Sequence, residues 1–268
     1  MGMACSCRSS QMKVIESFQY DPTFAQIHFP TISVELAVKQ LGLFYEQERA
    51  FIPQTLLYYY VRVLEAANSQ ELAFRIKFLK LGSRGFLYLS RILPFYTHIQ
   101  ELRLWKVAVN EEDVDKLGEA LRVLGALKVL SLEDIQLRDR GAIAVARGLA
   151  VLRHLEELWL SANDISSEGV VSLSRALLKL PSLHTLVLSY NCMGDAGCVA
   201  LCNVLVQRSG LRKLELVDNQ LGAEAGQALV QVVQRNSSLT VDVSRNALSE
   251  EEVKQLLSVC GQGALKTA

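Results

Sequence analysis

Apolar residues recur along the chain from residue 71 with a step of 28 residues, shortened to 27 at the last step. In the segment Leu155–Ile165, Leu158 and Leu160 alternate with Trp159, which is the spacing of a strand, and helical spacing follows. The matching strand positions of the successive units are Phe74, Leu102, Leu130, Leu158, Leu186, Leu214 and Val241. Five such columns keep register over seven units, so the pattern predicts a solenoid of seven strand–helix repeats over residues 71–268.

The alternation within each strand places every second side chain in the core and its neighbours on the opposite, concave face. The helix packs its apolar columns against the strand, and each repeat buries its faces only against the next one. An asparagine that can pair backbone groups left open at the turn follows the strand in the last four repeats: Asn163, Asn191, Asn219 and Asn246. Small residues at the predicted loop-to-helix turn allow close backbone passage: Gly141, Gly169 and Gly197.

The repeat unit resembles that of the ribonuclease-inhibitor-like subfamily of leucine-rich repeat proteins. Leu183–Leu205 matches the subfamily pattern L-x-x-L-x-L-x-x-N-x-L followed by a helix rich in leucine and alanine, and the resemblance covers residues 71–268. It implies an α/β leucine-rich repeat horseshoe solenoid, with parallel strands on the concave face and helices on the convex face. Members of the subfamily bind unrelated proteins, so the resemblance implies a protein-binding scaffold without naming its partner.

Residues 15–70 lack the repeat pattern. Helical stripes of apolar residues occupy Ser33–Arg49 and Gln54–Ala67, and Pro53 stands where it favours the start of the second helix. Because the exposed end of an open solenoid has to be covered, we predict that this region is a helical N-terminal cap. The alternative is a small independent binding module, which about 40 residues support poorly because they bury too little apolar surface alone.

Residues 1–14 form a polar, flexible tail that begins with a lipidation motif. The initiator methionine, Gly2 and Ser6 fit the N-myristoylation pattern M-G-x-x-x-[ST]. The tail resembles the doubly acylated start of Src-family kinases, which implies myristoylation of Gly2 and palmitoylation of Cys5 and Cys7. One myristoyl chain binds a membrane only marginally, so a second acyl chain is needed for stable anchoring on its cytoplasmic face.

Cysteine spacing and terminal signals favour a reducing, cytosolic setting. The six cysteines lie at positions 5, 7, 192, 198, 202 and 260 without the spacing of a disulfide framework, and the N-terminus lacks the apolar segment of a secretory signal. No run of 18 apolar residues occurs, so no transmembrane helix is predicted. Two alternatives to lipid anchoring stay open: an unmodified tail, and translation from Met3, which would remove the motif.

Composition and motifs argue against several classes of function. Lysine plus arginine and aspartate plus glutamate number 28 each, so the net charge is zero and bulk attraction to nucleic acid is not expected. The sequence contains no phosphate-binding loop, nucleophile elbow or metalloprotease motif. Cys192, Cys198 and Cys202 invite a zinc interpretation, but the last two replace small or apolar residues of the repeat, which predicts buried thiols. We therefore expect no catalytic residue, cofactor, metal or small-molecule substrate.

Outward-facing strand residues form lanes on the predicted concave face. Both tryptophans of the chain lie in these lanes, where the core does not require them, and tryptophan, tyrosine and arginine dominate interface energetics. We predict that a partner protein binds here through Arg103, Trp105, Glu133, Glu157, Trp159, Tyr190, Lys213, Glu215 and Asp218. Smaller residues of the lanes are expected to face outward as well: Ser131, Thr185, Val187, Ser189 and Ser244. The alternative is that all of these are ordinary exposed residues lining the curve.

Together these features predict a non-enzymatic adaptor or scaffold that binds a partner protein on its concave face and is held on the cytoplasmic face of a membrane by N-terminal lipids. A second interpretation is a regulator of an enzyme, such as a GTPase-activating or inhibitory module that works by direct contact. A third is a soluble ubiquitin-ligase or cytoskeletal adaptor without a lipid anchor.

Overall fold

The computed structural model describes residues 73–77, 97, 99–107, 114–260 and 265–267, and for residues 73–77 it describes the backbone alone. The lipidation residues Gly2, Cys5 and Cys7 and the predicted cap at residues 15–70 lie outside these ranges. Within the described ranges, no helix combines the length and the apolar character that crossing a membrane requires.

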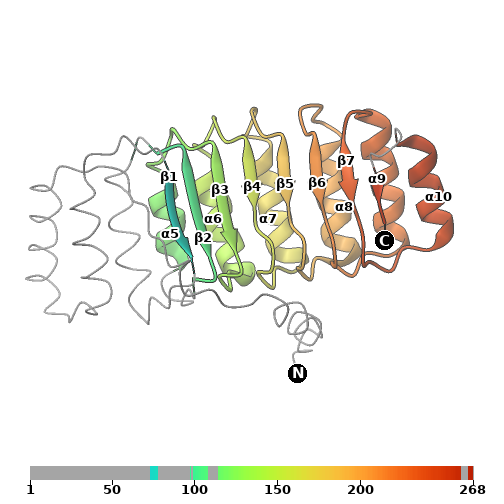
Figure 1. Ribbon diagram of the computed structural model, residues 1–268, viewed down its shortest axis with the longest axis horizontal. Coiled ribbons are helices and arrows are strands. Elements are labelled where there is room, and N and C mark those ends of the chain that lie inside the picture. Colours follow the sequence, from blue (N-terminus) through green and yellow to red (C-terminus); the bar gives the residue numbers. More distant parts are fainter. Residues whose placement is uncertain (1–72, 78–96, 98, 108–113, 261–264, 268) are drawn as a thin grey trace, which may run out of the picture.

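Strands and helices alternate along the described chain. The strands form one parallel sheet in sequence order, so each strand pairs with the next one along the chain (Figure 1). The elements are β1 (Ala73–Lys77), β2 (Glu101–Trp105), α5 (Val114–Leu121), β3 (Val129–Glu133), α6 (Arg138–Leu149), β4 (Glu157–Trp159), α7 (Ser167–Leu177), β5 (Thr185–Val187), α8 (Gly194–Leu205), β6 (Lys213–Glu215), α9 (Ala223–Arg235), β7 (Thr240–Asp242), α10 (Glu250–Val259) and β8 (Leu265–Lys266).

The strand register follows the repeat columns of the sequence. Phe74 pairs with Leu102 and Leu158 with Leu186, and the same column continues to the pair Leu214 and Val241. The prediction of a leucine-rich repeat solenoid is therefore confirmed. The sheet also contains a short strand that the pattern did not predict, β8, which pairs with β7.

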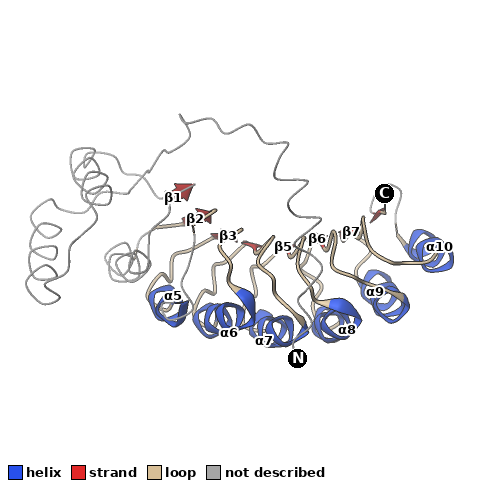
Figure 2. Cartoon of the chain, turned by 90° about the horizontal axis from the view of Figure 1, so that it is seen from below, coloured by secondary structure: helices blue, strands red, loops and turns tan. Residues whose placement is uncertain are grey.

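The hydrophobic core lies between the sheet and the helices. Figure 2 shows the strands along the inner side of a curve and the helices along its outer side. Leu158 of β4, Leu160 directly after it, and Leu173 and Leu177 of α7 are almost completely buried. Equivalent residues continue this core through successive repeats. Burial of one such side chain contributes about 1.5–3 kcal/mol.

The asparagine column closes the turns, as predicted from the sequence. The side-chain oxygen of Asn163 accepts a hydrogen bond from the backbone N–H of Ile135 at 3.1 Å, in the preceding repeat. Its amide nitrogen donates to the carbonyl of Leu160 at 3.1 Å and to that of Leu132 in the preceding repeat. Each such asparagine therefore satisfies buried backbone groups in two repeats at once.

Three glycines predicted to lie at loop-to-helix turns lie instead inside the helices. Gly141, Gly169 and Gly197 are buried in the first turns of α6, α7 and α8. A Cβ atom on Gly197 would stand 3.1 Å from the Cα of Ser167, at the start of the preceding helix. These glycines therefore allow the helices of successive repeats to approach closely, rather than relaxing the backbone of a loop.

Aspartates link the start of one helix to the helix of the next repeat. In the first turn of α6, Asp139 Oδ1 accepts hydrogen bonds from the backbone N–H groups of Ser166 at 2.8 Å and Gly169 at 3.0 Å. In α8, Asp195 Oδ1 accepts one from the N–H of Gly222 at 2.5 Å. Each carboxylate thus satisfies donors at the N-terminus of the following helix that have no partner within that helix.

Candidate protein-binding surface

Several of the predicted binding residues project from the concave face of the sheet. Glu157 and Trp159 of β4, and Lys213 and Glu215 of β6, are half-buried, whereas Leu158 between the first two is fully buried. This alternation follows from the pleat of a strand, which points successive side chains to opposite faces. The sequence pattern therefore predicted the direction of these side chains correctly.

Trp159 lies at the centre of a connected cluster on this face. Its indole Nε1 donates a hydrogen bond to Glu157 Oε2 at 2.9 Å. The ammonium of Lys213 lies 5.0 Å from the centroid of the Trp159 ring and 2.8 Å from Glu215 Oε1. The indole is thus fixed by a carboxylate at its edge and a cation over its face.

A hollow of about 370 Å³ opens beside this cluster. Five of the nine predicted binding residues line it: Trp105, Glu133, Trp159, Tyr190 and Glu215. Its ionisable carboxylates are Glu133, Asp134 and Glu215, and Val187 and Val217 contribute apolar surface. The structure therefore brings aromatic rings and carboxylates from several repeats to one place on the concave side.

The other four predicted residues do not line the hollow. Glu157 and Lys213 contact Trp159, as described above. Arg103 forms an ion pair with Glu101 of its own strand, with Nε 2.5 Å from Oε1. Asp218 lies in the turn after β6, where its N–H donates to the carbonyl of Ser244 at 3.0 Å.

The small residues of the lanes are buried, which the sequence pattern did not predict. Each of these side chains is at least nine-tenths buried: Ser131, Thr185, Val187, Ser189 and Ser244. Ser131 Oγ donates a hydrogen bond to Glu133 Oε1 at 2.7 Å, and Ser189 Oγ accepts one from the N–H of Val217 at 3.2 Å. Because neighbouring strands lie about 5 Å apart, longer side chains can cover the short ones beside them.

Tyr190 lies at a turn position with unusual backbone geometry. In the turns that follow strands β2 to β7, the residue at one equivalent repeat position has φ between 53° and 59°: Lys106, Asp134, Ala162, Tyr190, Asp218 and Arg245. This left-handed conformation costs roughly 1–2 kcal/mol for a residue with a side chain, and bulky residues adopt it rarely. The repeat pattern of the sequence gives no sign of this constraint at Tyr190.

Asp134, one of the carboxylates that line the hollow, is partly buried. Burial raises its pKa above the ordinary value of 3.8, the positive charge of Lys106 opposes this rise, and Asp164 adds to it. The Lys106 ammonium also lies 5.4 Å from the centroid of the Trp105 ring. An additional cation entering the hollow would therefore be attracted by a carboxylate that is already poorly solvated.

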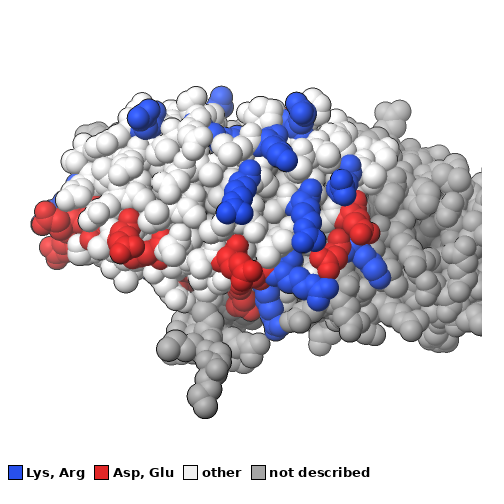
Figure 3. Space-filling view, turned by 180° about the vertical axis from the view of Figure 1, so that it is seen from behind, with Lys and Arg blue, Asp and Glu red and all other residues white. Residues whose placement is uncertain are grey.

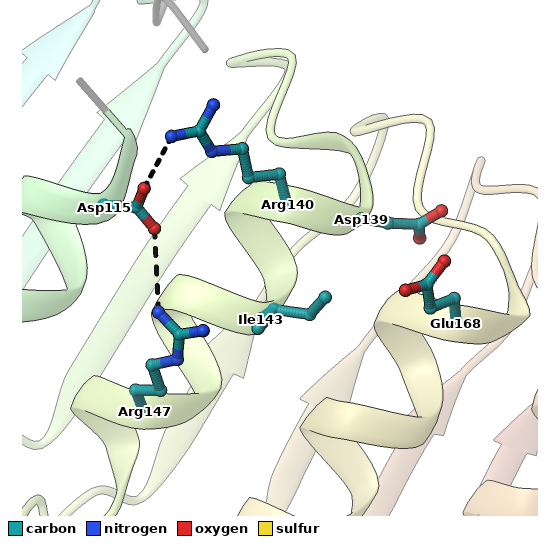
Figure 4. A pocket seen from close by; sticks show the side chains of 6 residues that line it. All are labelled: Asp115, Asp139, Arg140, Ile143, Arg147 and Glu168. Carbon is teal, nitrogen blue, oxygen red and sulfur yellow. Dashed lines mark hydrogen bonds and ion pairs between the residues drawn. The ribbon is translucent and has the colours of Figure 1, made fainter. Parts of the chain in front are cut away.

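The helical face on the other side of the molecule carries charges of both signs. Figure 3 shows Asp and Glu gathered toward its lower edge, and Lys and Arg spread from its upper edge down to the acidic side chains. A second hollow, of about 420 Å³, lies on this face and is lined by Asp115, Asp139, Arg140, Ile143, Arg147 and Glu168 (Figure 4). Asp115 pairs with both arginines, with its oxygens 2.7 Å from Arg140 Nη2 and 3.8 Å from Arg147 Nη1. Asp139 accepts a hydrogen bond from the start of α7. Because Asp115, both arginines and Asp139 already have partners within the protein, we assign no ligand to this hollow.

Cys198 and Cys202 are buried, in agreement with their predicted role as core thiols. Their sulfur atoms lie 3.9 Å apart on α8. This contact, followed by burial, raises the pKa of Cys198 well above 9.0, so the neutral thiol is the stable form. Across the part of the chain that the structure describes, no group of three or more His, Cys, Asp or Glu residues is placed to hold a metal ion.

Comparison with known proteins supports the repeat assignment. Three segments match the leucine-rich repeat family, at residues 151–174, 179–202 and 211–230. No curated protein matches the chain by sequence. The fold is that of a leucine-rich repeat solenoid, a class whose members generally mediate protein–protein interaction and are typically not enzymes. The narrower resemblance to the ribonuclease-inhibitor-like subfamily stays a prediction.

Solved structures provide two further similarities. The chain is similar to the actin-binding site 2 segment of leiomodin-1, with 12% identity, a TM-score of 0.42, and coverage of 57% of this chain and 88% of that one. It is also similar to a protein from Bacteroides fragilis, with 14% identity, a TM-score of 0.40, and coverage of 75% of this chain and 67% of that one.

Proposed function

We propose that this protein is a non-enzymatic interaction scaffold whose concave face binds a partner protein, and that the partner inserts a basic side chain into the hollow between Trp105 and Trp159. The observation that carries the proposal is the combination of two indoles and Tyr190 with Glu133, Asp134 and Glu215 around one hollow. Aromatic faces and carboxylates both attract a guanidinium or ammonium group.

The protein's own contacts support this choice of ligand chemistry. The ammonium of Lys213 already lies over Trp159, and that of Lys106 lies near Trp105. Contacts of this kind contribute about 0.5–2 kcal/mol, with larger values when water is excluded. Tryptophan and tyrosine are also the residue types that most often dominate binding energy at protein interfaces.

The second part of the proposal concerns location. We propose that myristoylation of Gly2 and palmitoylation of Cys5 and Cys7 hold the scaffold on the cytoplasmic face of a membrane. The support is the sequence motif, together with the need for two acyl chains for stable anchoring. Fractionation of cells that express wild type or Gly2→Ala tests this part separately, since loss of the lipid leaves the concave face intact. Recovery of both proteins in the membrane fraction at equal levels would refute it.

Intrinsic fluorescence tests the concave-face proposal, because both tryptophans of the chain line the hollow. We expect a peptide containing arginine to change the emission of the full-length protein in a saturable way, and a matched peptide with glutamate in place of arginine to leave it unchanged. Trp159→Phe should weaken the binding, whereas Arg175→Ala, an exposed residue of α7 on the helical side, should not. Equal responses to the two peptides would contradict the proposal.

A further inference from the structure

The loops that lead from each helix to the next strand form one edge of the solenoid, because parallel strands in register place equivalent loops side by side. We call this the helix-to-strand edge, and define its described part as residues 122–128, 150–156, 178–184, 206–212 and 236–239. Its cationic residues are Arg122, Lys128, Arg153, Lys179, Arg208 and Arg212. In these loops the single acidic residue is Glu156. The edge is therefore strongly basic, although the whole chain has no net charge.

Acidic residues recur at the opposite edge, where the helices begin. The acidic residues in the first turns of the described helices are Asp115, Asp139, Glu168, Asp195, Glu224, Glu250, Glu251 and Glu252. Figure 3 shows the acidic side chains toward one edge of the helical face, whereas the cationic ones extend from the other edge across the face, and some lie beside the acidic ones. Helix dipoles favour charges of these signs near helix ends. Lys128, Arg153 and Arg212 lie several residues beyond their helices, so the dipoles do not account for them.

The cations of this edge are available to a ligand. Within the described residues, none of the exposed side chains Arg122, Lys128, Arg153, Lys179 and Arg212 takes part in an ion pair. Arg208 differs from them, because its guanidinium donates hydrogen bonds to the carbonyls of Leu177 and Leu180. These bonds stabilise the C-terminal end of α7. Glu156 lies beside His184, with 3.7 Å between Oε2 and Nε2.

Exposed apolar side chains lie in the same loops as these cations. Val123 is 44% exposed, Val151 is 42% exposed and Leu178 is 53% exposed. They make up three of the four large apolar side chains that are exposed in the described part of the chain. Val123 directly follows Arg122, and Leu178 directly precedes Lys179. The edge therefore combines apolar side chains with cations, repeat after repeat.

We infer that the helix-to-strand edge binds an anionic membrane surface, with its cations on lipid phosphates and Val123, Val151 and Leu178 inserted shallowly between the headgroups. The arrangement favours a membrane over an acidic protein for two reasons. The apolar side chains are separated by cations, whereas a protein interface needs a contiguous packed centre. The loops also form a row with about 8–10 Å between successive helices, which suits a broad surface of repeating charges. This inference uses residues separate from both the acyl chains and the concave face.

Sedimentation with lipid vesicles tests the inference directly. The full chain, produced in bacteria so that Gly2 carries no myristoyl group, is mixed with phosphatidylcholine vesicles, either pure or with about one third phosphatidylserine. We expect binding only to the anionic vesicles, and a decrease in binding as salt concentration rises. Each basic residue near such a surface is worth roughly a fivefold change in partition, so the triple variant Arg122→Glu, Arg153→Glu, Lys179→Glu should lose at least a hundredfold.

Two further variants separate specific docking from bulk charge. The control Arg245→Glu, Lys254→Glu removes exposed cations outside the helix-to-strand edge and should bind almost as well as wild type. Leu178→Ser should weaken binding without any change in charge. The inference is overturned if neutral vesicles bind equally well, or if the control loses as much affinity as the triple variant. Binding of heparin to the protein provides the last comparison. If Leu178→Ser binds vesicles as well as wild type does, and heparin binds the protein as tightly as the vesicles do, the edge is a site for acidic polymers and the inference is overturned.

Discussion

The side-chain oxygen of Asn191 accepts a hydrogen bond from the backbone N–H of Asn163, at 3.1 Å, across the boundary between two repeats. It accepts a second one from the N–H of Ile165, also at 3.1 Å. The amide nitrogen of the same residue donates to the carbonyls of Leu160 and Leu188 at 3.0 and 2.8 Å. One side chain therefore satisfies buried backbone groups of its own repeat and of the one before it.

Replacement of this asparagine should be costly. In Asn191→Ala, two buried N–H groups lose their acceptor, and each unsatisfied group costs about 1–3 kcal/mol. Asn219→Ala is the matched comparison, because Asn219 Oδ1 is buried without a hydrogen-bond partner and only its amide nitrogen is bonded. Urea denaturation should give a larger loss for Asn191→Ala than for Asn219→Ala. The reverse order would contradict this account of the turns.

Two glycines that differ in their surroundings give a second stability test. A Cβ atom on Gly118 of α5 would stand 2.3 Å from the carbonyl oxygen of Ala144 in α6, whereas one on Gly125 would meet no atom within 4 Å. Alanine normally stabilises a helix by about 1 kcal/mol relative to glycine. Here the clash should reverse that sign, so that Gly118→Ala lowers stability by about 1–3 kcal/mol. Gly125→Ala should stay within about 0.5 kcal/mol of wild type by thermal unfolding.

Asp134→Asn should stabilise the protein in a pH-dependent way. Burial raises the pKa of Asp134 in the folded state, so ionisation favours the unfolded chain, and this loss of stability begins as pH rises past 3.8. Asparagine stays neutral and tolerates the left-handed backbone at this position. We expect a gain of a few tenths of a kcal/mol at pH 7, because the group is only partly buried. The gain should disappear below about pH 3.8, where the aspartate is neutral in both states. A gain that persists unchanged there would assign the effect to the backbone instead.

The cysteines of α8 should resist alkylation in the folded protein. Cys198 and Cys202 are buried, whereas Cys192 is partly exposed. The contact with Cys202 and burial raise the pKa of Cys198, which lowers the amount of reactive thiolate. Peptide mapping after brief iodoacetamide treatment at pH 8 should therefore find Cys192 modified well before Cys198, and all of them modified in urea. Similar rates for Cys192 and Cys198 in the native protein would refute this.

The same thiol should also make stability depend on alkaline pH. Because the folded-state pKa of Cys198 lies above 9.0, its contribution to stability is complete below pH 9 and falls as pH rises beyond it. Cys198→Val removes this titration. Comparison of denaturation at pH 8 and pH 10 should show a smaller pH-dependent loss for the variant than for wild type.

Lys213 should compete with a partner for Trp159. Its ammonium covers one face of the ring and pairs with Glu215. We expect Lys213→Ala to tighten binding of the arginine peptide by about two- to fivefold, since a cation over an exposed ring is worth about 0.5–1 kcal/mol. Glu215→Gln should weaken the binding instead. Fluorescence titrations of the two variants measure both effects, and weaker binding by Lys213→Ala would count against a basic ligand.

The repeat columns predicted the positions of Leu158, Leu160 and Asn163 correctly, because a core position accepts few residue types. The same columns could not predict the burial of Val187, which depends on the lengths of neighbouring side chains rather than on its own identity. The left-handed backbone at Tyr190 was also missed, since tyrosine gives no signal for it. The basic helix-to-strand edge could not be predicted from the net charge of zero, because the net charge contains no information about where the charged residues lie.

The direction of the asparagine contacts has a consequence for synthesis on the ribosome. The N–H groups of Ile135 and Asn163 are satisfied by asparagines 28 residues later in the chain, so each turn stays incomplete until the next repeat has left the exit tunnel. At ordinary translation rates this delay is about 1–6 s per repeat. During synthesis, the last turn to emerge therefore has backbone N–H groups that still lack an acceptor. Chaperones that bind nascent chains would contact this turn first.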